Sequence, residues 1–396
     1  MEADAAHPAR PLARRMGDIE PFHVMELLAR ARELEAAGRS IVHMEIGEPD
    51  FTTPQPVLDA AQQALAEGRT HYTPALGLPA LREAIAGYYR SHYGVEVSAG
   101  RIVVTPGASG ALLLALGVLL DRDSEVLLAD PGYPCNRHFV RFIEGRATGI
   151  PVDASTGYQL SAALLAQHWS DTTRAAMVAT PSNPTGTLIP GKELAAMAKL
   201  AAERGGALLV DEIYHGLVYE QQTPTALALS DELFVINSFS KYFCMTGWRL
   251  GWLVVPEAYR REVEKLAQNL FIAAPTLAQY AALAAFSAES LAILEQRKEA
   301  FRQRRDYLLP ALRELGFDIP VTPQGAFYLY ADCSRFSNDS YSFASELLEQ
   351  AGVAITPGID FGQYRAEHHL RFAYTTSMEQ LQEGVSRLRR YLQSRC

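Results

Sequence analysis

The chain has 396 residues, of which 48% are apolar, and its formal net charge is −9. This length allows a large buried core divided between two domains, and the apolar content excludes wholesale disorder. The excess of acidic residues argues against a general nucleic-acid-binding protein, whose affinity depends on cationic contacts to phosphate. No run of about eighteen apolar residues is free of polar interruptions, so no membrane span is expected.

The four cysteines form no C-x-x-C pair, so the sequence indicates neither a disulfide framework nor a zinc site. They are Cys135, Cys244, Cys333 and Cys396. We therefore expect a reducing compartment, the cytoplasm. The N-terminus is rich in Ala, Pro and Arg and lacks the apolar core of a secretory signal. Residues 1–18 are predicted to be a mobile tail.

Taken in chain order, the first predicted element is an amphipathic helix over Glu20–Ala37. It precedes a strand-like run, Ile41–Ile46. Both are expected to pack with the C-terminal part of the chain rather than with the segment that follows them.

From about residue 100, short apolar runs alternate with helical segments. Continuous apolar runs are typical of strands buried on both faces of a mostly parallel sheet. Strand–helix–strand order implies right-handed crossovers and an α/β architecture. The predicted strands are Ile102–Thr105, Glu125–Ala129, Ala147–Val152, Ala175–Thr180, Ala207–Asp211, Phe234–Asn237 and Leu250–Val255. Helices are expected at Gly107–Leu119, Ser161–His168 and Lys192–Arg204.

After Pro256 the pattern changes to long helices followed by a mixture of strands and helices. The long helices are predicted at Glu257–Leu270, Leu277–Ala300 and Phe301–Leu315. Short strands follow at Gly325–Tyr330, Val353–Thr356 and Leu370–Tyr374, with helices at Ser342–Gln350 and Met378–Ser394. We predict a large α/β domain, residues 48–280, with a mostly parallel seven-stranded sheet between helices. Residues 19–47 and 281–396 would form a smaller α+β domain.

Only five of the basic residues are lysines, and four of these lie on predicted solvated helix faces. The fifth, Lys241, ends the segment N-S-F-S-K directly after a buried strand, where sites form in α/β sheets. A desolvated lysine has a lowered pKa and can act as a nucleophile or form a Schiff base. A structural lysine is the alternative.

Residues suited to hold a phosphate lie close to this lysine in the sequence and in one upstream loop. Ser238 and Ser240 are hydroxyl donors, and Arg249 supplies a planar fork. The small residues of T-P-G-A-S-G, Gly107, Ala108 and Ser109 among them, join a strand to a helix N-terminus, which favours an anion. The loop is not the dinucleotide pattern G-x-G-x-x-G, which counts against a nicotinamide dehydrogenase. Together these features indicate a lysine Schiff base beside a cofactor phosphate.

Asp211 ends another buried strand and is equally well explained as a helix cap or as a site residue. A pyridinium nitrogen would favour the second role, since an ion pair at about 3 Å contributes roughly 5 kcal/mol at an effective dielectric constant of 20. Tyr214 and Asn183 are candidates to hydrogen-bond the ring's phenolic oxygen, and Tyr133 to stack on the ring. A turn and ordinary packing are the alternatives for these three.

The motifs S-N-P-T-G, D-E-I-Y, S-x-S-K and M-T-G-W-R-L-G-W, in this order, resemble class I/II aminotransferases of the fold-type I pyridoxal-phosphate superfamily. The resemblance runs from about residue 19 to the C-terminus. It implies pyridoxal 5'-phosphate as cofactor, with Lys241 joined to it and Asp211 paired with the pyridine nitrogen. Asn183 and Tyr214 would contact the phenolic oxygen. The implied phosphate-loop and phosphate-binding residues are Gly107, Ala108, Ser109, Ser238, Ser240 and Arg249.

Three further segments carry the same resemblance. Tyr72, in H-Y-T-P, would reach across a homodimer interface into the partner's site. Arg371 would bind the substrate α-carboxylate together with Asn183, and Gly47 in I-G-E-P-D would line the same place. A surface strand arginine is the alternative for Arg371. No metal is expected, because adjacent histidines in a strand, here at 368 and 369, point to opposite faces.

The implied reaction is ping-pong transfer of an amino group from an L-amino acid to a 2-keto acid, with Lys241, Asp211 and Tyr214 as catalytic residues. Ser109 stands where aspartate-using relatives can carry a lysine for the distal carboxylate, and the segment 269–275 is apolar. A neutral or hydrophobic donor is therefore favoured, with pyruvate or 2-oxoglutarate as acceptor. The alternatives are a carbon–sulfur β-lyase, an aspartate aminotransferase, or a regulator with an aminotransferase-like domain.

Overall fold

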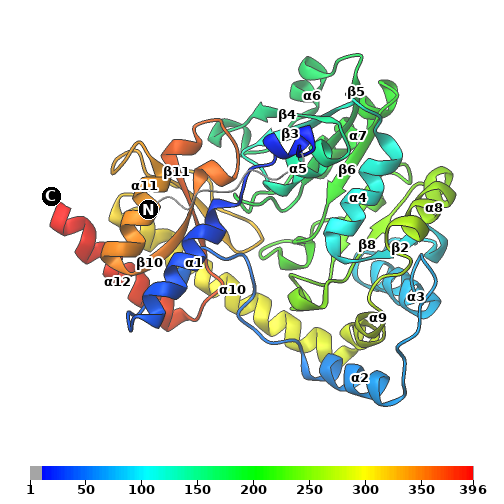
Figure 1. The fold of residues 1–396 in the computed structure, drawn as a ribbon, viewed down its shortest axis with the longest axis horizontal. Coiled ribbons are helices and arrows are strands. Elements are labelled where there is room, and N and C mark those ends of the chain that lie inside the picture. Colours follow the sequence, from blue (N-terminus) through cyan, green and yellow to red (C-terminus); the bar gives the residue numbers. More distant parts are fainter. Residues whose placement is uncertain (1–10, 396) are drawn as a thin grey trace.

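The computed structural model describes residues 11–395, which contain two β-sheets covered by helices (Figure 1). The larger sheet has the order β2-β8-β7-β6-β5-β3-β4, and only β8 runs antiparallel to its neighbours. This confirms the predicted α/β fold with a mostly parallel seven-stranded sheet. Its strands are β2 (Ile102–Thr105), β3 (Glu125–Asp130), β4 (Arg146–Pro151), β5 (Thr173–Ala179), β6 (Ala207–Asp211), β7 (Phe234–Ser238) and β8 (Gly251–Val254).

Both faces of this sheet are apolar, which explains the continuous apolar runs in the sequence. In β6, Leu208 and Val210 belong to one hydrophobic cluster, and Leu209 between them belongs to another on the opposite face. Helices α4 (Gly107–Leu119) and α8 (Arg260–Leu270) supply residues to the second cluster. Helix α7 (Gly191–Glu203) supplies Leu194 and Met197 to the first, together with Leu165 of α6 (Ala162–His168).

Three helices of this part of the chain were not predicted. They are α2 (Gln55–Ala66), α3 (Pro79–Tyr88) and α5 (Cys135–Phe142). Helices α2 and α3 carry proline in their first turn, where its missing N–H costs nothing. The proline therefore marks a helix start here, although it is also a signal for a turn. Helix α5 is only eight residues long and follows a loop rich in Pro and Gly.

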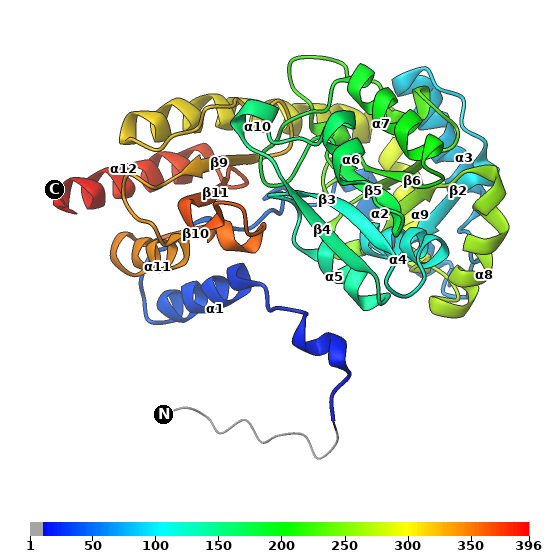
Figure 2. The same cartoon turned by 90° about the horizontal axis from the view of Figure 1, so that it is seen from above.

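The smaller sheet contains strands from both the N-terminal and the C-terminal part of the chain. Its order is β1-β10-β11-β9, and β1 pairs in parallel with β10. Helix α1 (His23–Ala36) packs against β10, with α11 (Ser340–Glu346) and α12 (Met378–Arg395) nearby (Figure 2). The residue limits proposed for the two domains stay a prediction. The strands are β1 (Val42–Met44), β9 (Tyr328–Asp332), β10 (Val353–Pro357) and β11 (His369–Ala373).

The prediction of a helix break between residues 300 and 301 is wrong. Residues Ala288–Leu315 form one helix of 28 residues, α10, and the break lies earlier, between it and α9 (Thr276–Leu283). The side chain of Ser287 accepts a hydrogen bond from Ser290 N and so caps the start of α10. This long helix extends from the smaller sheet to the larger part of the molecule (Figure 1).

Of the tail predicted to be mobile, residues 1–10 lie outside the described residues. Further along, Asp18 accepts a hydrogen bond of 2.6 Å from Arg141 Nε, and the guanidinium of Arg15 lies 5.6 Å from the ring centre of Phe142. Both partners lie on α5.

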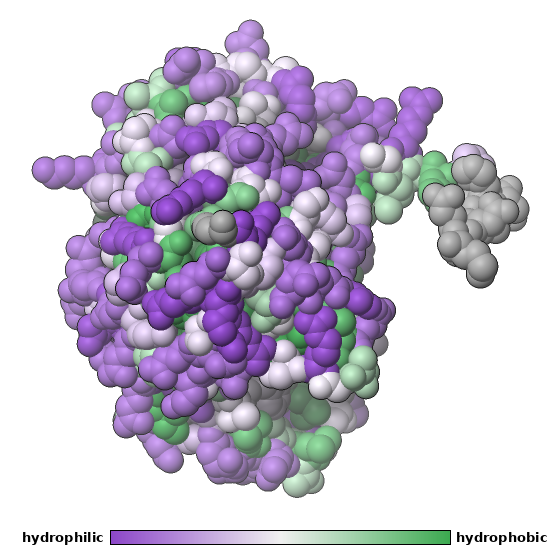
Figure 3. Space-filling model, turned by 90° about the vertical axis from the view of Figure 1, so that its left-hand side faces the viewer, coloured by the Kyte–Doolittle hydropathy of each residue, from purple (hydrophilic) through white to green (hydrophobic). Residues whose placement is uncertain are grey.

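The side of the molecule shown in Figure 3, with the helices of the smaller sheet, is mostly hydrophilic. Within residues 11–395, no single helix is long and apolar enough to cross a membrane. Residues Thr276–Phe286 and Ala288–Leu315 reach that length and composition only as a pair, across a bend of 82°.

Candidate active site

A cavity of about 440 Å³ lies at the edge of the large sheet where β2, β5, β6 and β7 end. Residues far apart in the sequence therefore meet there, as expected for a parallel sheet. Of the residues predicted for the site, Gly107 and Tyr72 are not among those that line this cavity. The others all line it: Gly47, Ala108, Ser109, Tyr133, Asn183, Asp211, Tyr214, Ser238, Ser240, Lys241, Arg249 and Arg371.

Lys241 is held at the cavity by a backbone carbonyl. Its Nζ donates a hydrogen bond of 2.7 Å to the oxygen of Gly47. Burial removes water from the ammonium group and lowers the pKa of Lys241 to about 8, while the carboxylate of Glu48 opposes this change. An amine with this pKa is substantially neutral near pH 8, so Nζ can attack a carbonyl carbon or accept a proton.

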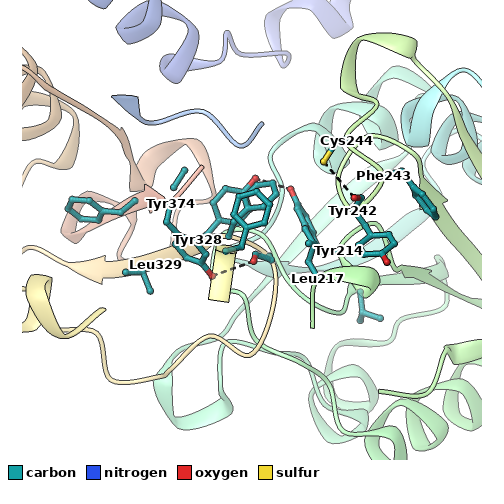
Figure 4. Packing of buried hydrophobic residues seen from close by; sticks show 14 of the residues in the cluster. Tyr214, Leu217, Tyr242, Phe243, Cys244, Tyr328, Leu329 and Tyr374 are labelled. Atoms are coloured by element: carbon teal, nitrogen blue, oxygen red, sulfur yellow. Dashed lines mark hydrogen bonds between the residues drawn. The ribbon is translucent and has the colours of Figure 1, made fainter. Parts of the chain in front are cut away.

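The approach of Gly47 to the lysine requires a glycine. A Cβ atom added there would lie 1.9 Å from the hydroxyl oxygen of Tyr328. That hydroxyl is also 2.8 Å from the hydroxyl of Tyr214, and the two tyrosines meet where the two sheets face each other (Figure 4). Sequence analysis missed Tyr328, because the segment G-A-F-Y around it reads only as a strand.

Asp211 is buried at the end of β6 and accepts one hydrogen bond, 2.9 Å from Ile213 N to its Oδ1. Burial raises the pKa of its carboxyl to about 6. A buried carboxylate with a single N–H donor is poorly compensated, and a cation placed beside it would restore the charged form.

An anion-binding arrangement lies at the N-terminus of α4. Gly107 has a φ of 68°, and a Cβ atom there would lie 2.8 Å from Nη2 of Arg249, so glycine lets the guanidinium approach the turn. Ser238 Oγ lies 3.0 Å from Ser240 Oγ on the adjacent wall. Free N–H groups of the first helical turn, two hydroxyls and a guanidinium are the groups that hold a phosphate.

Arg371 is buried on β11, so the alternative of a surface arginine is wrong. Its guanidinium lies 4.3 Å from the ring centre of Tyr328 and 4.8 Å from that of Phe361. Nη1 donates to Asn183 Oδ1 at 3.0 Å, and Nη2 donates to the carbonyl oxygen of Glu45 at 2.5 Å. The fork is therefore fixed in orientation, and N–H groups remain for a carboxylate.

One more feature of the wall was not foreseen. The first turn of α1 lines the cavity with Phe22, Val24 and Met25, although the sequence suggested only that this helix packs with the C-terminal part. Tyr72 is 83% exposed and does not line the cavity of its own chain. The position of the first turn of α1 has no local sequence signal, since it depends on how distant segments meet.

The family described as aminotransferase class I and II matches residues 39–388. The chain belongs to this family. A valine–pyruvate aminotransferase of Mycobacterium tuberculosis is 40% identical over 378 residues, 95% of this chain and 97% of that protein.

Solved structures agree with this assignment. The crystal structure of an aminotransferase from Mycobacterium tuberculosis has a TM-score of 0.94 and 40% identity, covering 97% of this chain and 100% of that one. The aspartate aminotransferase from Thermus thermophilus with maleate has a TM-score of 0.91 and 36% identity, covering 96% of this chain and 99% of that one.

This aminotransferase is thus a transaminase of a family that uses pyridoxal 5'-phosphate. Three observations show that its cavity fits the cofactor. Lys241 has the lowered pKa of a reactive amine, and Asp211 is a buried carboxylate that a pyridinium would compensate. The turn at Gly107 leaves room for the guanidinium of Arg249 beside a helix N-terminus, where a phosphate would be held.

In the cofactor-free protein, Asp211→Asn should raise the free energy of unfolding relative to the wild type, and by more at pH 8 than at pH 4. The folded carboxyl has a pKa of about 6, above its unfolded value of about 4, so the stability of the wild type falls as the pH rises through this window. A shift of about two pKa units corresponds to a change of about 3 kcal/mol in the free energy of unfolding. Urea unfolding of both forms at both pH values measures this difference, and an equal difference at the two pH values would contradict it.

Proposed function

We propose that this aminotransferase transfers the amino group of a neutral or hydrophobic L-amino acid to a 2-keto acid, such as pyruvate or 2-oxoglutarate, by a ping-pong mechanism. The observation that carries the donor preference is the apolar part of the cavity wall. Apolar side chains there favour an aliphatic substituent, because a charged one would lose its hydration. They belong to Phe22, Val24, Met25, Ile46, Leu112 and Ile213.

The charges of the wall support the same preference. Among the described residues that line the cavity, the cations are Lys241, Arg249 and Arg371. We assign Lys241 to the cofactor, Arg249 to its phosphate and Arg371 to the substrate α-carboxylate, which leaves none for a second carboxylate. Glu48 adds a negative charge to the wall. The similarity to a valine–pyruvate aminotransferase is consistent with this proposal.

The cofactor would be held by residues of the large sheet's edge. Asp211 would pair with the ring nitrogen, Asn183 and Tyr214 would contact the ring's phenolic oxygen, and Tyr133 would stack on the ring. Ala108, Ser109, Ser238, Ser240 and Arg249 would hold the phosphate. When bound, pyridoxal phosphate supplies an aldehyde for the amino group and an electron-withdrawing ring.

The remaining work falls to the chain's own side chains. Arg371 binds the α-carboxylate with a guanidinium already oriented by Asn183, so little side-chain entropy is lost on binding. Lys241 Nζ takes the proton from the substrate Cα and later returns one, and its pKa of about 8 suits both directions near neutral pH. Gly47 orients Nζ through its carbonyl oxygen.

We further propose a homodimer in which Tyr72 reaches the partner's site. Tyr72 is largely exposed. Three other large apolar side chains are exposed as well: Leu65 near the end of α2, Leu270 at the end of α8, and Ile272 between α8 and α9. The carbonyl oxygen of His71 accepts a hydrogen bond from Thr276 Oγ1, which joins the two segments. An exposed apolar surface of this kind is typical of an interface.

A cytoplasmic location is also proposed, supported by the free cysteines at 135, 244 and 333.

Lys241→Ala should lower transamination at least roughly 10³-fold, because the variant lacks both the amine that joins the cofactor and the general base. Steady-state assays with a keto acid acceptor measure the loss. Lys265→Ala is the matched control, since Lys265 pairs with Glu262 on an exposed helix face and should be dispensable. Wild-type turnover by the Lys241 variant would contradict its role.

The donor preference can be tested by mixing the holoenzyme with each of the twenty amino acids in the absence of a keto acid. Without a keto acid only the first half-reaction occurs, and its rate is read from the change in cofactor absorbance. Valine, leucine and alanine should give this change, and aspartate should give it at least about ten-fold more slowly. Faster reaction with aspartate would favour the second candidate function, that of an aspartate aminotransferase. The similarity of this chain to the aspartate aminotransferase from Thermus thermophilus supports that candidate. Continuous keto-acid release would instead indicate a lyase.

Mixing Tyr72→Ala and Lys241→Ala chains should restore activity if each site uses both chains. One of the two sites in a mixed dimer then has both residues intact, and half of the dimers are mixed at equal ratio. About a quarter of the wild-type activity is therefore expected after exchange. Mass spectrometry verifies the mixed dimer, and verified mixed dimers without regained activity would contradict a shared site.

A further inference from the structure

The first turn of α1 is held by a carboxylate from the other end of the chain. Asp360 is buried, and its Oδ1 and Oδ2 accept hydrogen bonds of 2.9 Å each from the N–H groups of His23 and Val24. The residue before the helix, Phe22, provides no side-chain cap. Asp360 therefore does the work of an N-cap from a distance, and its negative charge also suits the positive end of the helix.

This turn is the part of α1 that lines the catalytic cavity, through Phe22, Val24 and Met25. The rest of the helix is held differently, by buried apolar residues on the face that packs against β10. They are Leu27, Leu28, Ala31 and Leu34. Three other side-chain contacts of the first turn are His23 with Glu26, His23 with the ring of Tyr341, and Glu26 with the hydroxyl of Tyr341. Tyr341 does not line the cavity, so none of these contacts joins the turn to another part of the wall.

The segment that carries Asp360 also contacts the other walls of the cavity. The ring of Phe361 lies 4.8 Å from the guanidinium of Arg371. The carbonyl oxygen of Phe361 accepts a hydrogen bond of 2.8 Å from Gly132 N, beside Tyr133. Residues 360 and 361 thus place the apolar wall and the carboxylate-binding arginine relative to each other.

We propose that Asp360 is a positioning residue for the choice of amino donor. By fixing the first turn of α1, its carboxylate sets where Phe22, Val24 and Met25 stand, and so sets the volume and the apolar contact open to the donor's side chain. The inference rests on the proposed use of neutral donors. Asp360 acts through α1 and has no contact with the reacting atoms.

The test compares donors of different size in the holoenzyme with Asp360→Asn. Asparagine has the same shape, but it has no charge and places an N–H group where one carboxylate oxygen accepted a hydrogen bond. The kcat/KM for valine and leucine should fall about ten-fold, as expected for a lost charged cap, mainly through KM. The kcat/KM for alanine should change less than about two-fold, because a methyl group offers much less surface for contact with the turn than the side chain of valine or leucine.

A matched control separates this role from a general loss of stability. Ser161 caps α6, a helix away from α1: its Oγ accepts a hydrogen bond of 3.1 Å from Leu164 N, and it does not line the cavity. Ser161→Ala should lower the melting temperature and leave the valine-to-alanine ratio of kcat/KM unchanged. Phe22→Ala, with the cap intact, should shift this ratio as Asp360→Asn does, and the double variant should add little.

His23→Pro provides a second route if Asp360→Asn does not fold. It deletes one of the two N–H donors and leaves Asp360 and the apolar side chains in place, and proline is favoured at the first helical position. The same ratio should fall about three-fold. An unchanged ratio, or an equal loss for valine and alanine, would overturn the positioning role and leave the proposed transamination intact. A wild-type enzyme that does not accept neutral donors would overturn both.

Discussion

The site depends on the burial of one amine, Lys241 Nζ, against the carbonyl oxygen of Gly47. The lysine follows a strand of the large sheet, and the glycine follows a strand of the small one, so this hydrogen bond exists only when both sheets are assembled. Loss of water lowers the pKa of the amine to about 8. The same contact brings Gly47 against Tyr328, where no side chain fits. Reactivity and the packing of the two sheets thus have a common cause.

Burial acts on the acidic partner in the opposite direction. Asp211 also loses water, and its pKa rises to about 6, so the cofactor-free protein contains a carboxylate that is costly to ionise. Arg371 is better compensated, because its guanidinium lies near the rings of Tyr328 and Phe361 and donates to Asn183 Oδ1 and to the carbonyl oxygen of Glu45. A site with a poorly compensated carboxylate such as Asp211 is less stable when empty and gains stability when a cation binds.

Much of the fold could be predicted, because the strands of the large sheet are apolar on both faces, as Leu208, Leu209 and Val210 show. Several residues proposed for the site, such as Asp211, could be picked out because they lie at or directly after the ends of such strands. The rest depends on contacts between distant segments. Nothing near Tyr328 or Asp360 in the sequence reveals that one meets Gly47 and the other holds the first turn of α1. The predicted helix break at residue 300 was wrong for a local reason: Ser287 caps the start of α10, and this cap was not recognised in the sequence.

The most direct measurement of the central claim is borohydride reduction of the holoenzyme, followed by proteolysis and peptide mapping. Reduction makes the link between an amine and pyridoxal phosphate permanent, and so reports which amine carries the cofactor. The account predicts a single pyridoxyl group on the peptide that contains Lys241. A pyridoxyl group on one of the other four lysines, or on none in a preparation that contains the cofactor, would contradict it.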